Sequence, residues 1–421
     1  MKRYPKYKDS GISWLGQIPE HWEVKQLRSF LKLFSEKGHA DSQLLSVTRE
    51  QGVIQRDVES KEENHNYIPE DLSGYKYIEK GDFVINKMKA WQGSYAVSDY
   101  DGIVSPAYYT CKLSGVNSRF FTMAIRSKVY VSFFAQYSKG IRVGQWDLET
   151  EALKAIPFFF PPLNEQQKID DFLDSKISKI DSYISEKEKE VKLLAELKQS
   201  QIAQVVTKGI NPNVPMKDSG ISWIGQIPEH WEIKRAKFMF KKHKRPCSPN
   251  DEVITCFRDG QVTLRKNRRT TGFTESEKYD GYQGIKKGDL VIHQMDAFAG
   301  SIGVSDSNGM GTSVYHCCTP LGDYSVYYYA YLIRQMALSG YIQSLYKGIR
   351  ERSSDFSFPI FGNQFLVIPP FEEQKAIVEY INTKCQSIDS MISNLESEIA
   401  YLKEYKQSLI ADAVTGAINV Q

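Results

Sequence analysis

The spacing of apolar residues changes at two Pro-Pro pairs, 161–162 and 369–370. Each pair divides its half of the chain into two parts with different apolar spacing. Before the pairs, short apolar runs separated by Gly and Asp, such as 81–88, 102–113 and 155–162, predict β-strands. One aromatic-rich helix is predicted over 119–137 and another over 326–345. The mixture predicts an α+β globular part before each Pro-Pro pair.

After each Pro-Pro pair, apolar residues recur every three or four positions, which is typical of a long helix with a coiled-coil seam. About 42 residues at 1.5 Å each give a helix of roughly 60 Å. The seam residues are Ile177, Ile180, Ile184, Val191, Leu194 and Val205 in the first segment, and Ile388, Ile392, Leu395, Ile399, Leu402 and Leu409 in the second. Lys187, Lys198, Gln201 and Lys406 interrupt the seam, so we expect looser pairing there.

The chain is a tandem duplication. Residues 9–26 (DSGISWLGQIPEHWEVKQ) and 218–235 (DSGISWIGQIPEHWEIKR) are identical at 15 of 18 positions. Shorter matches occur at KGD, VSD and KGIR, then at PPLNEQQKI against PPFEEQKAI, and at VTKGIN against VTGAIN. A period near 208 residues is far too long for a solenoid, so the sequence predicts a pseudosymmetric protein whose two helices pair antiparallel.

Between these matches the two halves diverge. Residues 44–71 and 252–279 share little beyond one aligned glycine, Gly52 with Gly260. Each half is therefore a constant frame that holds a variable insert. We expect globular domains at 1–160 and 215–370, and long helical segments at 161–214, which includes a linker, and at 371–421.

Composition indicates a folded protein. The 421 residues include 54 Lys+Arg, 51 Asp+Glu and 41% hydrophobic residues. With no membrane-length apolar run and no signal-like start, we expect a cytoplasmic protein. The spacing of its six cysteines is typical neither of a disulfide framework nor of zinc ligands, so reduced structural thiols are expected.

Positive charge concentrates in the globular segments. Residues 1–160 carry 22 basic and 19 acidic residues and residues 215–370 carry 20 and 15, whereas the helical segments carry 12 and 17. Two basic runs, 241–245 and 265–269, suit contacts to phosphates and base edges, although a solvated basic loop explains either run alone.

Motifs of catalysis are missing from the sequence. It has no GxxxxGKS/T phosphate loop, and neither Pro-Pro pair comes after the Asn or Asp that an adenine methyltransferase needs. Glu186, Glu188 and Glu190 alternate along a helix and point apart, which favours a solvated face over a metal site. His21 and His230, with Trp22 and Trp231, are interpreted as packing residues rather than metal ligands.

The duplicated SGISWxGxIPEHWE openings, the two KGIR segments and the two PPxxEQxxI junctions before long helices resemble the specificity subunits of Type I restriction-modification systems over essentially the whole length. The resemblance implies two target-recognition domains, each reading half of a bipartite DNA sequence, and antiparallel helices that set the spacer and dock the methyltransferases. It also implies no catalysis in this chain. The implied partners are two methyltransferase subunits that bind S-adenosylmethionine, and nuclease/translocase subunits that use ATP and Mg²⁺.

Candidate DNA contacts can be chosen by side-chain chemistry, because Arg and Lys pair with guanine and Gln with adenine. In the first half they are Arg49, Gln51, Arg56, Lys87, Lys89, Gln92, Tyr95 and Arg142. In the second they are Arg258, Gln261, Arg265, Arg268, Arg269, His293, Gln294 and Arg350. For Trp91 and Tyr95 a place in the domain core is an equal alternative, and Arg142 and Arg350, in the KGIR segments, suit phosphate positioning better than base reading.

Two other functions remain open at this point. One is the specificity subunit of a bipartite cutter whose partner fuses methyltransferase and nuclease. The other is an interaction scaffold that binds protein through its acidic helices, against which the basic inserts argue.

Overall fold

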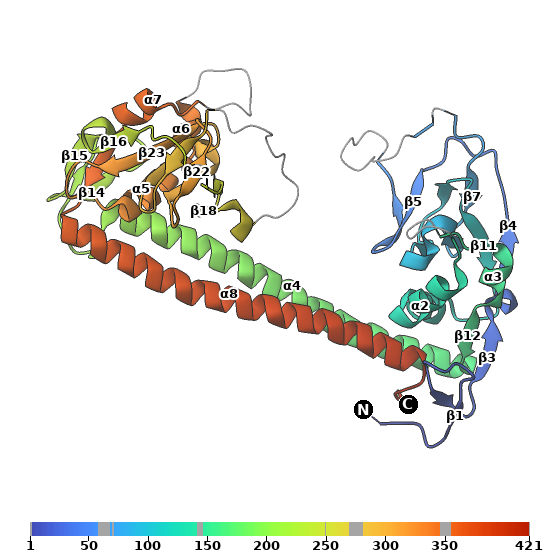
Figure 1. Cartoon of the computed structure of the whole chain (residues 1–421). Coiled ribbons are helices and arrows are strands. Elements are labelled where there is room, and N and C mark those ends of the chain that lie inside the picture. Colours follow the sequence, from blue (N-terminus) through green and yellow to red (C-terminus); the bar gives the residue numbers. More distant parts are fainter. Residues whose placement is uncertain are drawn as a thin grey trace. The chain divides into compact units, whose positions relative to one another are not determined.

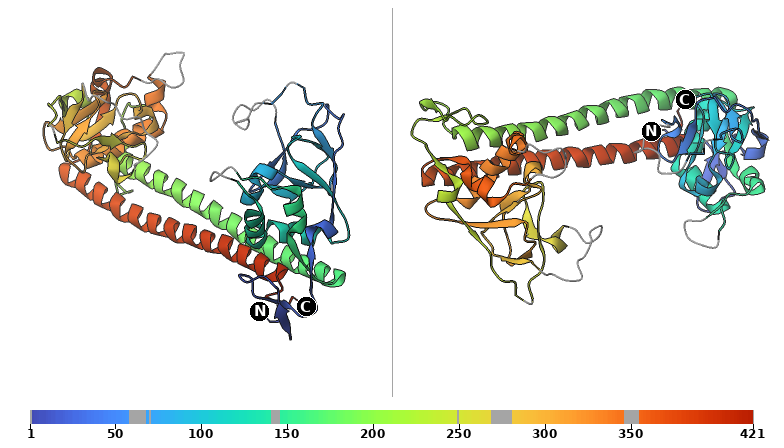
Figure 2. Two further views of the ribbon diagram at one scale, coloured as in Figure 1. Left: turned by 45° about the vertical axis from the view of Figure 1, so that its right-hand side comes forward. Right: turned by 90° about the horizontal axis from the view of Figure 1, so that it is seen from above.

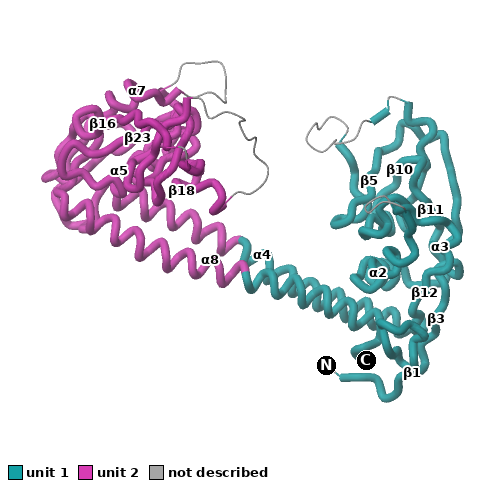
Figure 3. Tube along the Cα trace, viewed as in Figure 1, with its two compact units in different colours: residues 1–188, 397–421 teal, residues 189–396 magenta. Residues whose placement is uncertain are grey.

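The computed structural model describes residues 2–57, 68–69, 71–140, 146–248, 250–268, 281–345 and 355–420. The chain divides into two compact units (Figure 3). Unit 1 comprises Met1–Glu188 and Ser397–Gln421, and unit 2 comprises Lys189–Glu396. Each unit therefore contains one globular part and one stretch of each long helix.

Each globular part is built on a four-stranded antiparallel sheet, in the order β4-β11-β8-β9 in unit 1 and β16-β23-β20-β21 in unit 2. The strands of unit 1 are β4 (Leu31–Phe34), β8 (Phe83–Ile85), β9 (Tyr95–Val97) and β11 (Tyr109–Leu113). Those of unit 2 are β16 (Phe240–His243), β20 (Leu290–His293), β21 (Ile302–Val304) and β23 (Tyr315–Pro320). The same strand order in both units confirms the α+β fold expected for each half.

The remaining strands form two-stranded antiparallel pairs around these sheets. In unit 1 the pairs are β1 (Tyr7–Asp9) with β2 (Gln17–Pro19), β3 (Glu23–Gln26) with β12 (Pro157–Phe160), β5 (Leu45–Thr48) with β6 (Gly52–Gln55), and β7 (Lys76–Ile78) with β10 (Gly102–Val104). In unit 2 they are β13 (Met216–Asp218) with β14 (Gln226–Pro228), β15 (Glu232–Arg235) with β24 (Phe365–Ile368), β17 (Ile254–Cys256) with β18 (Val262–Leu264), and β19 (Gln283–Ile285) with β22 (Gly309–Gly311).

The predicted aromatic helices are each broken in two, which corrects the sequence-based expectation. The first becomes α1 (Ser118–Arg126) and α2 (Lys128–Tyr137), because Ser127 has extended backbone angles (φ −67°, ψ 155°). The second becomes α5 (Val326–Leu338) and α6 (Tyr341–Ser344), since Gly340 adopts φ 78°, a left-handed conformation that ends a helix. Apolar residues resume directly after Lys128 and after Gly340, so the apolar spacing alone predicts one helix in each place.

Shorter helices complete the two units. They are α3 (Thr150–Ala155) and α7 (Phe358–Asn363), and the 3-10 turns η1 (Leu27–Ser29), η2 (Lys87–Gln92), η3 (Ala236–Phe238), η4 (Arg265–Asn267) and η5 (Ala297–Ala299). The glycines directly after η2 and η5, Gly93 and Gly300, both have positive φ (91° and 90°) and so reverse the chain into β9 and β21.

The long helices α4 (Leu163–Lys208) and α8 (Phe371–Val414) pair antiparallel within each unit (Figures 1 and 2). In unit 1, Asp181 contacts Lys406 and Lys187 contacts Glu398, so residue numbers rise along one helix as they fall along the other. Around these pairs the seam is apolar: Ile180, Ile184, Ile399 and Leu409 are buried in unit 1, and Ile202, Val205, Ile381 and Ile388 in unit 2. The predicted antiparallel coiled coil is confirmed.

The two strongest sequence matches, EHW and PPxxEQ, meet in space in each unit. In unit 1, Glu165 at the start of α4 accepts hydrogen bonds from Trp22 Nε1 (3.1 Å) and Tyr4 Oη (2.6 Å), and lies 2.7 Å from His21 Nε2. In unit 2, Glu373 accepts from Trp231 Nε1 (3.1 Å) and lies 2.8 Å from His230 Nε2. Trp22 and Trp231 are fully buried, which confirms packing roles for them and gives their histidines a carboxylate partner.

The glutamine of each PPxxEQ junction ties the long helix to the globular part. Gln166 accepts from the backbone N–H of Asn117 (2.9 Å), the residue that caps α1, and donates to the Pro161 carbonyl (2.8 Å). Gln374 does the same in unit 2 with the N–H of Ser325, which caps α5, and the Pro369 carbonyl, both at 2.8 Å. The repeated glutamate and glutamine are therefore structural.

The repeated end of each long helix also has a structural role. In unit 2, Gly209 comes directly after α4 with φ 74°, and a Cβ there would lie 2.9 Å from Glu373 Oε1 and 3.4 Å from Trp231. In unit 1, Gly416 lies just beyond α8 with φ 73°, and a Cβ there would collide with Pro19. The chain termini meet at the same place, where Lys2 forms a β-bridge to Asn419 (Figure 2).

Candidate nucleic-acid interfaces

In unit 1 the variable insert begins with the β5–β6 hairpin, whose turn exposes Arg49, Glu50 and Gln51. Thr48 fixes this turn, because its Oγ1 accepts the N–H of Gln51 (3.1 Å) and donates to the carbonyl of Gly52 (3.1 Å). The hairpin thus holds two of the predicted DNA contacts, Arg49 and Gln51, in one solvent-exposed turn.

Unit 2 builds the equivalent hairpin from β17 and β18 with different turn residues. The turn closes through a hydrogen bond from the Phe257 N–H to the Gln261 carbonyl (2.8 Å), and Asp259 Oδ1 accepts the N–H of Gln261 (3.1 Å). Arg258 and Gln261 are exposed on it. Both turns thus expose an arginine followed by an acid, Arg49-Glu50 and Arg258-Asp259, and differ in the order of the glutamine and glycine that follow.

A hollow of about 690 Å³ in unit 1 brings Arg49 together with Gln92. Arg126, Lys128 and Gln407 also line it. Nearby on η2, Lys89 is exposed, whereas Lys87 Nζ lies 2.9 Å from Asp147 Oδ2. This ion pair raises the pKa of Lys87 and holds its charge in place. Among the candidates of unit 1, Arg49, Gln51 and Lys89 are exposed and Gln92 is half-buried.

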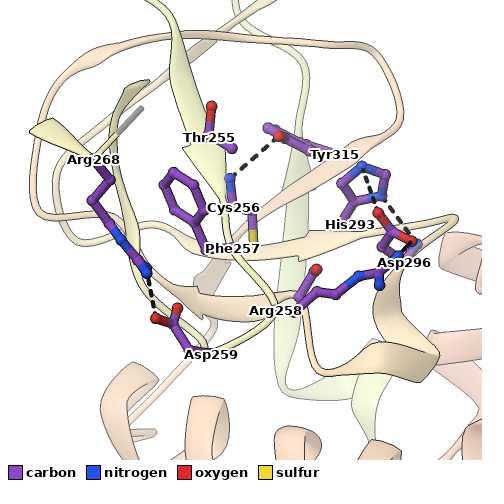
Figure 4. Close-up of a pocket in the computed structure, with 10 residues that line it drawn as sticks. Thr255, Cys256, Phe257, Arg258, Asp259, Arg268, His293, Asp296 and Tyr315 are labelled. Atoms are coloured by element: carbon purple, nitrogen blue, oxygen red, sulfur yellow. Dashed lines mark hydrogen bonds and ion pairs between the residues drawn. The ribbon is translucent and has the colours of Figure 1, made fainter. Parts of the chain in front are cut away.

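A cavity of about 520 Å³ in unit 2 brings together three candidates, Arg258, Arg268 and His293 (Figure 4). Arg268 Nη1 lies 2.6 Å from Asp259 Oδ2, and its guanidinium carbon sits 4.4 Å from the centre of the Phe257 ring. Arg258 Nη2 lies 3.1 Å from Asp296 Oδ1. Both arginines are thus oriented by acids in partly exposed pairs, which a base edge or phosphate could replace at little cost.

His293 supplies a neutral group to the same cavity. Burial lowers its pKa, an effect that nearby Asp296 opposes. Its Nδ1 accepts the backbone N–H groups of Met295 (3.2 Å) and Asp296 (3.1 Å), so the neutral ring carries its proton on Nε2. The imidazole is therefore a hydrogen-bond donor, which suits an acceptor such as guanine O6 or N7.

Other candidates lie elsewhere or have a different role. Tyr95 is fully buried and stacks on Phe134 with ring centres 3.9 Å apart, so its expected DNA contact is wrong and its alternative, domain core, is correct. Gln294 donates a side-chain hydrogen bond to Asp355 in unit 2. The Lys87–Asp147 ion pair is the equivalent contact in unit 1. Arg56 and Arg265 lie on the ends of the hairpins, half-buried. Arg142, Arg269 and Arg350 lie outside the described residues.

The basic run 241–245 is only partly available to nucleic acid. Arg245 forms a bidentate ion pair with buried Asp289 of the repeated KGD turn. In unit 1, Lys112 takes that place, with its Nζ 3.0 Å from Asp82 Oδ2. No sequence feature indicates that Arg245 neutralises a buried acid, nor that Phe257, Asp259 and Asp296 line the cavity.

All six cysteines are free of disulfide bonds. Burial raises the pKa of Cys111 and of Cys317 to about 12, so both are thiols at neutral pH. They are packing residues of the two sheets. Among the described residues, every helix is too short or too polar to cross a lipid bilayer.

Residues 19–193, which span the EHW opening, the first hairpin and most of α4, match the family described as Type I restriction modification DNA specificity domain. Over this segment the chain is similar to that family. The Type I restriction enzyme MjaVIII specificity subunit of Methanocaldococcus jannaschii is 22% identical over 96% of this chain and 95% of its own length.

Solved structures of the family share the fold. A chain from a Type I restriction-modification system, studied for complex assembly and conformational transition, covers 95% of this chain and 99% of itself with a TM-score of 0.67 at 16% identity. The specificity subunit of Thermoanaerobacter tengcongensis covers 97% and 100%, with a TM-score of 0.53 at 16% identity. The fold of a specificity subunit thus extends over both units.

Proposed function

We propose that this chain is the DNA specificity subunit of a Type I restriction-modification complex, in which each globular part reads one half of a bipartite target. The observation that carries the proposal is that the equivalent hairpins border differently lined hollows, with Gln92 beside Arg49 in unit 1 and with Arg268 and His293 beside Arg258 in unit 2. A duplicated frame with unlike reading residues suits recognition of two unlike half-sites.

The proposed reading residues are those that reach solvent near the hairpins. In unit 2 they are Arg258, Arg268 and His293, which surround one cavity, and in unit 1 Arg49, Gln51, Lys89 and Gln92. Guanidinium groups and the imidazole N–H are donors for guanine O6 and N7, and the glutamines suit adenine. The remaining cations near the hairpins, Arg56 and Arg265, contribute phosphate contacts.

The chain has no catalytic role in this proposal. Two methyltransferase subunits bind the paired helices and supply S-adenosylmethionine, and nuclease/translocase subunits supply ATP and Mg²⁺. The helices set the spacer between half-sites. A specificity subunit with a fused methyltransferase-nuclease partner is the second candidate, and the genes beside this one distinguish the two.

A selection experiment tests the proposal. The chain is purified with its methyltransferase subunits, mixed with random duplex DNA, and the bound fraction is sequenced. Enrichment of a bipartite sequence with two different halves is expected, and the chain alone should transfer no labelled methyl group. Binding without any sequence enrichment would refute the role in specificity, and methyl transfer by the chain alone would refute the non-catalytic role.

A further inference from the structure

Two half-buried arginines at equivalent positions bind backbone carbonyls instead of acids. Arg126 on α1 donates from Nη1 to the Tyr95 carbonyl (3.0 Å), and from Nη2 to the carbonyls of Arg49 (2.9 Å) and Glu50 (2.6 Å). Arg334 on α5 donates from Nε to the Gly300 carbonyl (3.1 Å) and from Nη2 to the Arg258 carbonyl (3.1 Å). The acceptors of both guanidinium groups are thus main-chain carbonyl oxygens.

Each arginine joins the constant frame to the turn of the variable hairpin. Arg49 and Arg258 are each the first residue of a three-residue turn, and both arginines bind the carbonyl at this position. Their other acceptors, Tyr95 and Gly300, lie in the segments that leave η2 and η5. The contacts are therefore made to backbone atoms, which remain when turn side chains differ.

The single residue shared by the two inserts explains how the arginine fits. Gly260 has φ 91°, and a Cβ on it would lie 2.7 Å from Arg334 Cδ and 2.8 Å from Nε. Gly52 has φ 77°, and a Cβ on it would lie 2.8 Å from the Ala96 Cβ and 3.4 Å from Arg126 Nη1. An added Cβ would therefore collide with the Arg334 side chain at Gly260 and with Ala96 at Gly52, so each glycine lets its hairpin lie close to the arginine.

The chemistry of these contacts requires arginine. Burial lowers the pKa of both guanidinium groups, yet they remain charged because arginine has the highest pKa of the side chains. A planar fork with five donors reaches several carbonyls at fixed angles, whereas a lysine ammonium presents a single point of attachment. Lysine would keep the charge and lose the geometry.

We propose that Arg126 and Arg334 are positioning residues for DNA recognition, each fixing the turn of its hairpin so that the exposed side chains meet the DNA from a constant backbone position. The inference rests on the proposed function. It explains how one frame accepts different inserts: the frame holds the backbone of the turn, and the turn side chains are left to specify the half-site.

Half-site discrimination in the complete complex with the methyltransferase subunits tests the proposal. Binding is measured to the target and to two DNAs in which one half-site or the other is scrambled. Arg126→Lys should lower discrimination at one half-site by about ten-fold and Arg334→Lys at the other, because each turn is fixed separately. Exposed arginines provide matched controls: Arg28→Gln on η1 and Arg235→Gln on β15 should leave both values unchanged.

The possible outcomes distinguish a failure of the proposed function from a failure of the inference on Arg126 and Arg334. A wild-type complex without bipartite preference would refute the proposed function. A wild-type complex with that preference, whose lysine variants keep full discrimination, would overturn the inference alone. Equal loss at both half-sites, or a lower unfolding temperature of one globular part, would also overturn it, because either result assigns the arginines a general role in stability.

A double-mutant cycle checks the link between glycine and arginine. Gly260→Ala should lower discrimination at the half-site that Arg334→Lys affects, and the double variant should lose little more than either alone, since both release the same turn. Gly288→Ala is the control, because Gly288 has a similar φ of 88° with no atom within 4 Å of the added Cβ. Additive losses would show that the two residues act independently and would overturn the shared role.

Discussion

The Lys198 ammonium lies 2.7 Å from both carboxylate oxygens of Asp389 across the helix pair of unit 2. In unit 1, Lys406 makes the same bidentate contact with Asp181, also at 2.7 Å. Lys406 follows Lys198 by 208 residues, and Asp389 follows Asp181 by the same number, so the two ion pairs are equivalent in the duplication. The lysines that interrupt the apolar seam are therefore paired with acids on the facing helix, and they specify the register of the antiparallel pairing.

The duplicated ion pair predicts how a half-length chain assembles. In a chain ending near residue 215, Lys198 lacks Asp389, but a second copy offers Asp181 in its place. We expect this fragment to dimerise at micromolar concentration. Asp181→Lys should weaken the dimer by about ten-fold or more through like-charge contact, and adding Lys198→Asp should restore it. Analytical ultracentrifugation measures this, and a folded but monomeric fragment would contradict the helix pairing.

Glu165 and Glu373 should differ in their contribution to stability. Replacing Glu165 with Ala leaves the buried Trp22 indole and the Tyr4 hydroxyl without an acceptor, and we expect a loss of about 2–4 kcal/mol of unfolding free energy. Glu373→Ala should cost about half as much, since Glu373 is 25% exposed against 3% for Glu165. Urea unfolding of the two variants measures the difference. Equal losses of unfolding free energy would show that the burial of the glutamate does not determine its contribution.

Asp170 predicts a pH-dependent loss of stability. Its side chain is fully buried in unit 1, its oxygens accept no hydrogen bond among the described residues, and Arg119 lies 3.8 Å away. Burial raises the pKa of Asp170, and Arg119 partly opposes the shift. Because the folded-state pKa exceeds the unfolded one, the relative stability is highest below the unfolded pKa and falls as the pH rises through the folded pKa.

Asp170→Asn removes this titration, so we expect it to raise stability at neutral pH by about 1 kcal/mol and to have less benefit near pH 4. Glu186→Gln is the matched control, since Glu186 is exposed on the same helix. Thermal unfolding between pH 4 and pH 8 measures both variants. If the stability difference between Asp170→Asn and the wild type is the same at every pH in this range, the pKa of Asp170 does not change on folding.

Arg268 should act on one half-site alone. Removing its guanidinium takes away a donor held at the unit 2 cavity by Asp259 and Phe257, so Arg268→Ala should lower discrimination at one half-site by about 1–3 kcal/mol. Lys237→Ala, which alters an exposed lysine of unit 2, should leave it unchanged. Competition binding with half-site variants measures the effect, and an equal loss at both halves would contradict independent reading.

Much of this architecture could be predicted from the repeats and the apolar spacing. The strands over 81–88, 102–113 and 155–162, both long helices and their pairing are confirmed, because each depends on local patterning and on the duplication. The breaks at Ser127 and Gly340 were missed because apolar residues resume just after each, although a glycine such as Gly340 is typical of a helix end. Tyr95 resembles an exposed aromatic in a turn-flanked segment, and only its stacking on Phe134 shows that it belongs to the core.

The hydrogen-bond and ion-pair partners of Arg126, Arg334 and Arg245 could not be predicted from the sequence either. Arg126 and Arg334 stand in aromatic helices without a nearby acid, because their acceptors are backbone carbonyls 31 to 77 residues away along the chain. In the sequence Arg245 belongs to a basic patch, and only the fold shows its pairing with Asp289. Such contacts depend on which strands and helices come together in the fold, which composition and spacing do not encode.

Sequencing of methylated adenines in DNA modified by the complete methyltransferase complex tests the central claim most directly. With the wild-type chain we predict methylation at one bipartite sequence, made of two different half-sites and an unspecified spacer, and no such methylation when the chain is omitted. Methylation at a contiguous or palindromic sequence, or an unchanged pattern without the chain, would contradict the account.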